Sequence, residues 1–143
     1  MKNIVFVLAL FIFAFTLISC GGSQEKQRAK SENTEIAQTA KVVVYYFHGK
    51  QRCKTCLAIQ KVTEETINEN FAKNADVRFM ELDYSDKANE AIAQKYEVAN
   101  SSLFVVAGES FINLTDVAFA NAVRNPDDLK GAIVVEVEKY LNK

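Results

Sequence analysis

The sequence has few of the residues that metal sites and phosphate-binding loops require. Its 143 residues include one histidine, three cysteines, five glycines and one proline. A structural zinc site takes four cysteine or histidine ligands, and no Cys-His pair is adjacent here, so no structural zinc site is expected. The glycines form no phosphate-binding loop. Because 17 basic residues stand against 18 acidic ones, the charge gives no reason to propose nucleic acid as a partner.

The first twenty residues are typical of an export signal. Lys2 precedes an almost wholly apolar run from Ile4 to Ile18. A run of that length is shorter than the roughly 20 residues of a spanning helix, which favours a cleaved signal. The sequence Leu17-Ile18-Ser19-Cys20 then resembles the bacterial lipobox, and this resemblance implies that Cys20 carries acyl chains. An ordinary secretory signal cut elsewhere, or an uncut anchor, is the alternative.

The sequence therefore divides into three parts. Residues 1–19 are the expected lipoprotein signal peptide, and residues 20–40 are the lipidated Cys20 with a polar, flexible tether. Residues 41–143 are long enough for one core and too short for two. We expect a monomer in the bacterial cell envelope, anchored to a membrane through Cys20 and facing the periplasm or the outside.

Cys53-Lys54-Thr55-Cys56 is the most informative motif. Two thiols three positions apart, between an apolar strand and a helix, are typical of a reversible disulfide. The dipole at a helix N-terminus favours a thiolate, which is the form that attacks disulfides. A static bridge is the alternative, but closing so small a loop removes little entropy from the unfolded chain.

The folded part shows seven elements in the order β-α-β-α-β-β-α. The run 42–47 is continuously apolar, which indicates a central strand buried on both faces. A helical stripe follows to about residue 71, and 77–82 alternates as a second strand. A short helix over 88–96 precedes a hairpin of 103–106 and 111–114, and Asn125-Pro126 starts a last helix with a capping side chain and a first-turn proline. Residues 115–124 show no strong pattern, and a short helix there is left open.

This order, with the cysteine pair at the first strand-helix junction, resembles the thioredoxin fold over residues 41–143. The resemblance implies an α/β fold, reduced to a βαβ-α-ββα core, with helices on both faces of a mixed four-stranded sheet. More narrowly, Tyr45-Tyr46-Phe47-His48-Gly49 with Arg52-Cys53-Lys54-Thr55-Cys56 resembles a family of small exported proteins labelled as nitrophenyl compound nitroreductase subunit (ArsF family). That name would imply a redox partner or an operon association.

The resemblance assigns roles around the motif. Cys53 would be the exposed attacking thiol and Cys56 the more buried resolving thiol. Arg52 stands where related proteins often carry Trp, and together with Lys54 it would favour the ionised form of Cys53. Lys54 and Thr55 replace the residues that set the reduction potential, which spans about −270 to −120 mV among such proteins. Thr55 could also bond nearby groups through its hydroxyl.

Two features of thioredoxins are missing. Their buried acid near the end of the first strand has no counterpart in Tyr45-Tyr46-Phe47, and His48 could substitute for it because histidine titrates near neutrality. Their cis-proline before the third strand is replaced by Ser101 or Ser102, where we expect a trans peptide bond. Without that proline, partner binding would be altered and metal capture by the dithiol becomes more plausible.

Three functions are compatible with this pattern. The leading one is a membrane-tethered thiol-disulfide oxidoreductase, without any cofactor beyond the Cys53–Cys56 disulfide, that exchanges electrons with a protein disulfide or dithiol in the cell envelope. The second is a module in which Cys53 and Cys56 bind a thiophilic metal; it is possible but not favoured. The third is a docking subunit of a larger redox complex.

Overall fold

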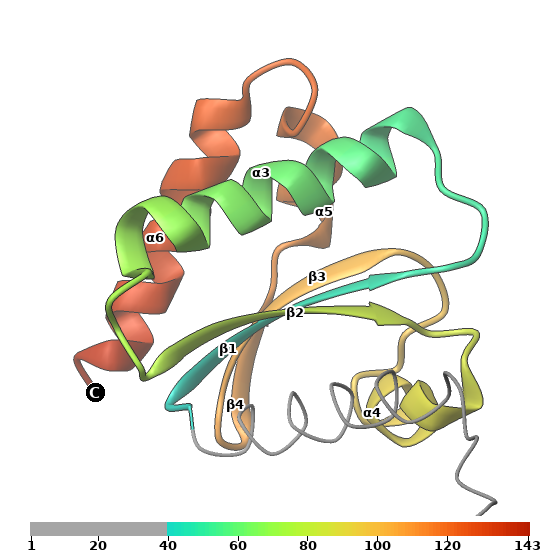
Figure 1. Ribbon diagram of the computed structural model, residues 1–143, viewed down its shortest axis with the longest axis horizontal. Coiled ribbons are helices and arrows are strands. Elements are labelled where there is room, and N and C mark those ends of the chain that lie inside the picture. Colours follow the sequence, from blue (N-terminus) through green and yellow to red (C-terminus); the bar gives the residue numbers. More distant parts are fainter. Residues whose placement is uncertain (1–39) are drawn as a thin grey trace, which may run out of the picture. The chain divides into compact units, whose positions relative to one another are not determined.

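The computed structural model describes residues 40–143. The predicted signal peptide, Cys20 and nearly all of the tether lie outside the described residues. Strands and helices follow each other in the order shown in Figure 1: β1 (Val42–His48), α3 (Lys54–Phe71), β2 (Val77–Asp83), a 3-10 turn η1 (Lys87–Asn89), α4 (Glu90–Lys95), β3 (Ser102–Ala107), β4 (Ser110–Asn113), α5 (Thr115–Asn121) and α6 (Pro126–Leu141).

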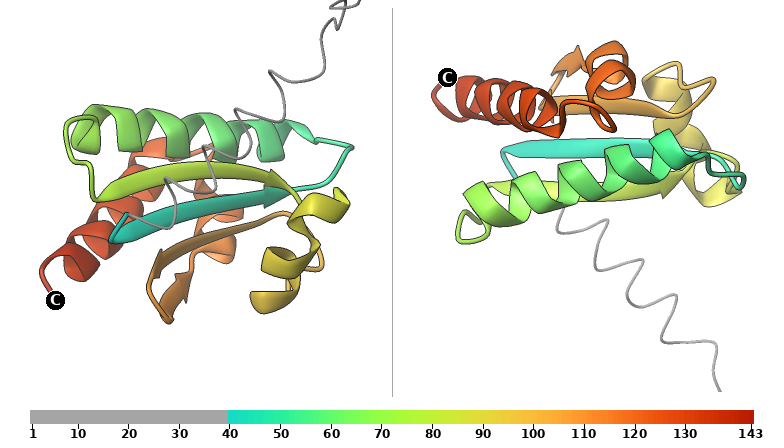
Figure 2. Two further views of the ribbon diagram at one scale, coloured as in Figure 1. Left: turned by 60° about the horizontal axis from the view of Figure 1, so that its bottom comes forward. Right: turned by 90° about the horizontal axis from the view of Figure 1, so that it is seen from above.

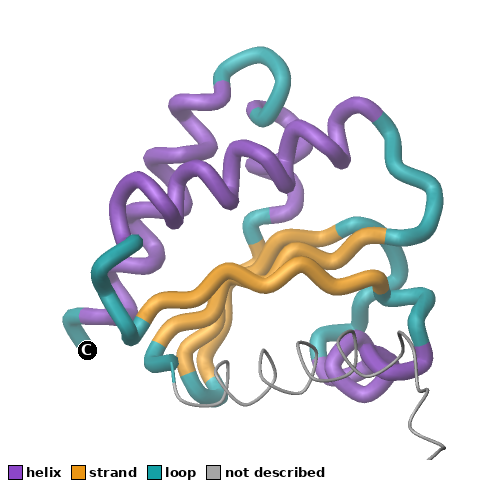
Figure 3. The backbone as a smooth tube through the Cα atoms, in the orientation of Figure 1, coloured by secondary structure: helices purple, strands orange, loops and turns teal. Residues whose placement is uncertain are grey.

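The four strands form one mixed sheet in the order β2-β1-β3-β4. Strand β1 pairs in parallel with β2 and antiparallel with β3, and β3 and β4 form an antiparallel hairpin. The parallel pair needs a crossover, which α3 supplies. Strand β1 is therefore central, as its continuous apolar sequence predicts, and the hairpin is also confirmed (Figure 3).

Successive side chains of β1 enter two separate cores, because a strand points its side chains to alternate faces. Val42, Val44 and Tyr46 pack in the larger core with residues of α3, α5 and α6. Val43, Tyr45 and Phe47 pack on the other face, where residues of α4 and the aromatic rings of Tyr96 and Phe104 join them. The two layers of helices are visible in Figure 2. This architecture confirms the predicted thioredoxin-like α/β fold.

The face that α4 covers is hollowed. A groove of about 590 Å³ runs beside Tyr45, Met80, Leu82 and Ile92. Because Tyr45 and Tyr46 point to opposite faces of β1, this groove lies across the sheet from the side that α3 covers. This groove is thus separated from the cysteine pair.

Several element boundaries differ from those expected. Residues 115–121 form the helix α5, with Leu114 as its N-cap residue. Strand β4 therefore ends at Asn113, one residue earlier than expected. Helix α6 begins at Pro126 as predicted, but the Asn125 side chain makes no capping hydrogen bond. Within residues 40–143, no helix combines the length and the apolar content that crossing a membrane requires.

Candidate functional site

Cys53 is the N-cap residue of α3. Its backbone is extended, with φ −77° and ψ 166°, and its Sγ accepts a hydrogen bond from the Cys56 amide at 3.1 Å. The first backbone N–H groups of a helix have no partner within the helix, so an acceptor at the N-cap satisfies one of them. The same contact stabilises negative charge on the Cys53 sulfur, because a donor pointed at an anion favours the anion.

The two thiols differ in exposure. Cys53 is exposed and Cys56 is buried, and both are free cysteines. Cys56 lies one turn into α3, on the side of the helix that packs against the sheet. A partner can therefore reach Cys53 first, while Cys56 waits behind it. This arrangement agrees with the exposures that the sequence resemblance implies.

Tyr46, from the adjacent strand β1, packs against Cys56. Its side chain is fully buried, and its hydroxyl donates a hydrogen bond to the Cys56 carbonyl at 2.8 Å. Burial, together with the nearby Cys56 sulfur, raises the pKa of Tyr46 to about 12, against the smaller effects of Arg52 and Ser101. Tyr46 is accordingly a neutral hydroxyl at physiological pH.

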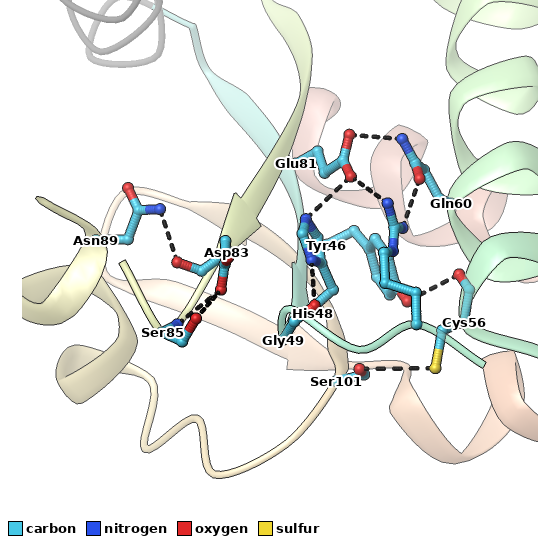
Figure 4. A network of polar contacts seen from close by, with 11 residues as sticks. Tyr46, His48, Gly49, Cys56, Gln60, Glu81, Asp83, Ser85, Asn89 and Ser101 are labelled. Atoms are coloured by element: carbon cyan, nitrogen blue, oxygen red, sulfur yellow. Dashed lines mark hydrogen bonds and ion pairs between the residues drawn. The ribbon is translucent and has the colours of Figure 1, made fainter. Parts of the chain in front are cut away.

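Ser101 completes the surroundings of Cys56 from the loop that precedes β3. Its hydroxyl lies 3.8 Å from the Cys56 sulfur (Figure 4). Burial opposes ionisation of Cys56, but hydrogen bonds from Cys53, Ser101 and Tyr46 outweigh it and lower the pKa of the Cys56 thiol below its ordinary value.

The neighbouring Ser102 has a different environment. It is buried, and its hydroxyl donates to the carbonyl of Asn100 within the same loop at 2.9 Å. The following amide, that of Leu103, donates to the hydroxyl of Thr115 at the start of α5. Of the two serines expected opposite the dithiol, Ser101 thus contacts Cys56 and Ser102 holds the loop. The peptide bonds of residues 40–143 include no cis form, in agreement with the expected trans bond.

Arg52, Gln60 and Glu81 form a closed polar network beside the motif. One guanidinium nitrogen of Arg52 lies 2.7 Å from Glu81 Oε1, the other donates to Gln60, and the Gln60 amide donates to the second oxygen of Glu81. The guanidinium also lies 5.8 Å from the centre of the Tyr46 ring. The positive charge next to Cys53 is therefore paired with a carboxylate.

His48 ends β1 and joins the same network. Its Nε2 lies 3.0 Å from Glu81 Oε1, and its Nδ1 lies 2.9 Å from the carbonyl oxygen of Gly49. Figure 4 shows the imidazole turned toward Glu81, while the Tyr46 hydroxyl is the group at Cys56. The structure therefore brings Tyr46 rather than His48 to the position beside the resolving thiol.

Lys54 and Thr55 occupy the first turn of α3 between the two cysteines. Lys54 is exposed and Thr55 is half-buried. In the part of the chain that the structure describes, no three His, Cys, Asp or Glu side chains group together as a metal site would require. Cys53 and Cys56 remain the two soft ligands of the motif.

Sequence reasoning did not single out Tyr46, Gln60 or Glu81. The burial of Tyr46 was expected, and a buried tyrosine hydroxyl usually has a hydrogen-bond partner, which was a usable signal. Glu81 stands opposite Tyr46 in the parallel pairing of β1 and β2. That register follows from the fold and could not be read from the strand 77–82 alone.

This chain is similar to a few solved structures, each at low sequence identity. No protein-family model matches the sequence, and no curated protein matches it. Among solved structures, a malarial protein is 17% identical, covering 71% of this chain and 98% of that chain, with a TM-score of 0.47. A mutant thioredoxin from Halobacterium salinarum NRC-1 is 21% identical over 72% of this chain and 80% of its own, with a TM-score of 0.48. Trxlp from Edwardsiella tarda EIB202 is 16% identical over 71% and 89%, with a TM-score of 0.43.

Proposed function

We propose that this protein is a thiol-disulfide oxidoreductase, in which Cys53 attacks a disulfide of a partner protein and Cys56 resolves the product. The observation that carries the proposal is the contact between the Cys56 amide and the Cys53 sulfur, on an exposed thiol that caps a helix. An accessible thiol next to a helix N-terminus is the environment in which cysteines become nucleophilic. The narrower resemblance to the nitroreductase-associated family stays a prediction.

The reaction balances within the dithiol. The Cys53 thiolate attacks one sulfur of the partner disulfide, so a mixed disulfide forms and the other partner sulfur leaves as a thiolate. Cys56, as a thiolate, then attacks the Cys53 sulfur. The Cys53–Cys56 bond forms, the bond to the partner breaks, and the second partner sulfur leaves and takes up a proton. Two electrons pass from the dithiol to the partner, and the same steps in reverse oxidise a partner dithiol.

The surface next to the dithiol suits a protein partner. Leu57, which follows Cys56 in α3, is 50% exposed, so an apolar side chain lies beside the reactive pair. Ser101 replaces the proline that the thioredoxin resemblance places opposite the disulfide. The partner groove is therefore expected to have a different shape from that of thioredoxins.

The experiment is reduction of insulin disulfides by dithiothreitol, followed by turbidity, with the full chain in detergent micelles. The wild-type protein is expected to accelerate the reaction, and both Cys53→Ser and Cys56→Ser to abolish the acceleration. Cys56→Ser should in addition accumulate a mixed disulfide through Cys53. Lys54→Ala is the matched control, since it changes the motif without removing a thiol. No acceleration by the wild type, together with failure of the pair to equilibrate with glutathione, would sink the proposal.

We also propose that the domain is tethered to a membrane of the bacterial cell envelope through lipid on Cys20. The support is the lipobox-like sequence at residues 17–20 and the polar composition of the segment that follows it. Acylation with more than one chain gives a stable anchor. Such a tether would leave the dithiol free to meet partners near the membrane surface.

A further inference from the structure

The buried thiol of Cys56 must lose its proton before the resolving step. Cys56 is 7% exposed, and it must become a thiolate before it can attack the mixed disulfide. Burial disfavours that charge. In thioredoxins a buried acid assists this step, and the corresponding stretch of β1 has none. The side chains that contact Cys56 instead belong to Tyr46, Ser101 and Cys53.

We propose that the hydroxyls of Tyr46 and Ser101 form a two-hydroxyl site that stabilises the Cys56 thiolate and carries its proton toward solvent. The inference rests on the proposed function, because it concerns the resolving step of that reaction. It assigns to these two side chains the task that a buried carboxylate performs elsewhere. Tyr46 and Ser101 contact the reacting residue from two different elements, so the site is built by the fold and not by the motif.

The placement of the two hydroxyls supports this assignment. Tyr46 reaches Cys56 from β1 and is anchored by its 2.8 Å hydrogen bond to the Cys56 carbonyl. Ser101 reaches the sulfur from the loop before β3, at 3.8 Å, and is only partly buried. The Tyr46 hydroxyl therefore lies on the buried side of Cys56, and the partly buried Ser101 hydroxyl lies nearer the surface.

A carboxylate accepts a proton, whereas these hydroxyls work by donation. Because the pKa of Tyr46 is about 12, its hydroxyl keeps its proton at neutral pH and cannot act as a resting base. The Ser101 hydroxyl donates to the Cys56 sulfur, whereas the Tyr46 hydroxyl donates to the Cys56 carbonyl and can turn to the sulfur only by giving up that bond. A hydrogen bond to a charged group is stronger than one to a neutral group, so ionisation of Cys56 favours such a turn. As Cys56 passes its proton to the Ser101 oxygen, Ser101 releases its own hydroxyl proton to solvent, so Ser101 stays neutral while Cys56 becomes a thiolate.

Few charges face Cys56. Cys53 lies at the start of the same helix as Cys56. Of the titratable groups of β1, Tyr46 is the one that contacts Cys56. Arg52 contacts the Tyr46 ring and is paired with Glu81. Lys54, on α3, and Asp116, on the packed helix α5, are both exposed. Cys53 is thus the nearest polar influence on Cys56, and the hydroxyls of Ser101 and Tyr46 follow it.

The first test measures the pH profile of Cys56 alkylation by iodoacetamide, in full-length protein carrying Cys20→Ser and Cys53→Ser. We expect Tyr46→Phe to shift the profile to higher pH and to slow alkylation about tenfold at neutral pH, because one donor to a charged group is lost. Ser101→Ala should act in the same direction, and Ser101→Thr should restore the hydroxyl. Access to a buried thiol changes the absolute rate but does not move the midpoint of the profile.

Tyr45→Phe is the matched control. Tyr45 is the preceding residue of β1, it is also buried, and its side chain lies on the opposite face of the sheet. Tyr45→Phe also removes one tyrosine hydroxyl, and we expect its pH profile of Cys56 alkylation to equal that of the protein carrying only Cys20→Ser and Cys53→Ser. If Tyr46→Phe fails to fold, as judged by circular dichroism, Ser101→Ala and Ser101→Thr carry the test without it.

The second test separates attack from resolution with an aromatic disulfide, dithiobis(nitrobenzoate), and Cys20→Ser protein. Attack by Cys53 releases one coloured thiolate, and resolution by Cys56 releases a second. Tyr46→Phe is expected to leave the first phase unchanged and to slow the second about tenfold. The inference is overturned if Tyr46→Phe and Ser101→Ala change neither phase and do not shift the pH profile of alkylation. That result would leave the proposed function intact. A wild type that shows two phases but does not reduce insulin would instead count against the proposed function alone.

Discussion

Removing the cap that Cys53 provides should destabilise α3 by a predictable amount. Cys53 Sγ accepts the Cys56 amide at 3.1 Å, and a side chain that cannot accept leaves that amide without its partner. Replacing a capping side chain by alanine costs about 1 kcal/mol, within a range of roughly 0.5 to 2. Serine is among the best capping residues, so Cys53→Ser retains the contact and Cys53→Ala loses it. We therefore expect Cys53→Ala to be the less stable of the two by about 1 kcal/mol.

The assay is thermal and urea unfolding of both variants in reducing buffer, followed by far-ultraviolet circular dichroism. For a domain of about 100 residues, 1 kcal/mol corresponds to a shift in Tm of roughly 4 to 8 °C. Lys54→Ala, at the first helical residue, is the control for a change in helix propensity without loss of the cap. Equal Tm values for Cys53→Ala and Cys53→Ser would refute the reasoning. They would also remove the geometric ground for thiolate stabilisation at Cys53.

Two further predictions concern Cys56 and Cys20. Because hydrogen bonds lower the folded-state pKa of Cys56, ionisation of this thiol favours the folded state. Relative to Cys56→Ser, the reduced protein should therefore become more stable as pH rises from that lowered pKa to the ordinary thiol value of 9.0, and should lose this extra stability as pH falls. Urea unfolding of both proteins at a series of pH values measures the difference. If the difference between the two proteins is independent of pH, the lowered pKa is wrong. Cells fed a fatty-acid analogue should label the wild-type protein and not Cys20→Ser, whereas equal labelling, or none in either, would contradict the lipid anchor.

The sequence predicts the fold well where one pattern dominates. Residues 42–47 are continuously apolar, and all six are buried in β1. The stripe of α3 is also predicted correctly, because Ile59, Val62 and Ile67 recur at helical spacing and are all buried. Helix α5 was left open because Ala118 is its one buried residue, while Val117 and Phe119 are exposed. A short helix with so narrow a buried stripe has no clear period.

The site is predictable only in its local part. Cys53 and Cys56 follow from their spacing, and their position at a strand-helix junction follows from the flanking patterns. Ser101 lies 45 positions from Cys56, so their contact depends on the antiparallel pairing of β1 with β3. Tyr46 is close to Cys56 in sequence, but its role depends on which face of β1 it takes. Alternation along a strand decides this face, and a strand buried on both sides carries no sequence signal of it.

The structure changes where the electrostatic support of the dithiol is sought. Sequence reasoning looks to the cations around Cys53, yet the Arg52 guanidinium is held 2.7 Å from Glu81 and is bonded to Gln60. A paired charge exerts a much weaker field at a third group than a free one, and the exposed Lys54 is screened by water and salt. The contacts that stabilise sulfur charge are the Cys56 amide at Cys53 and, at Cys56, hydrogen bonds from Cys53 itself and from the hydroxyls of Ser101 and Tyr46. Each acts over the length of one hydrogen bond, so the charge of the dithiol depends on its nearest neighbours at the start of α3, on β1 and in the loop before β3.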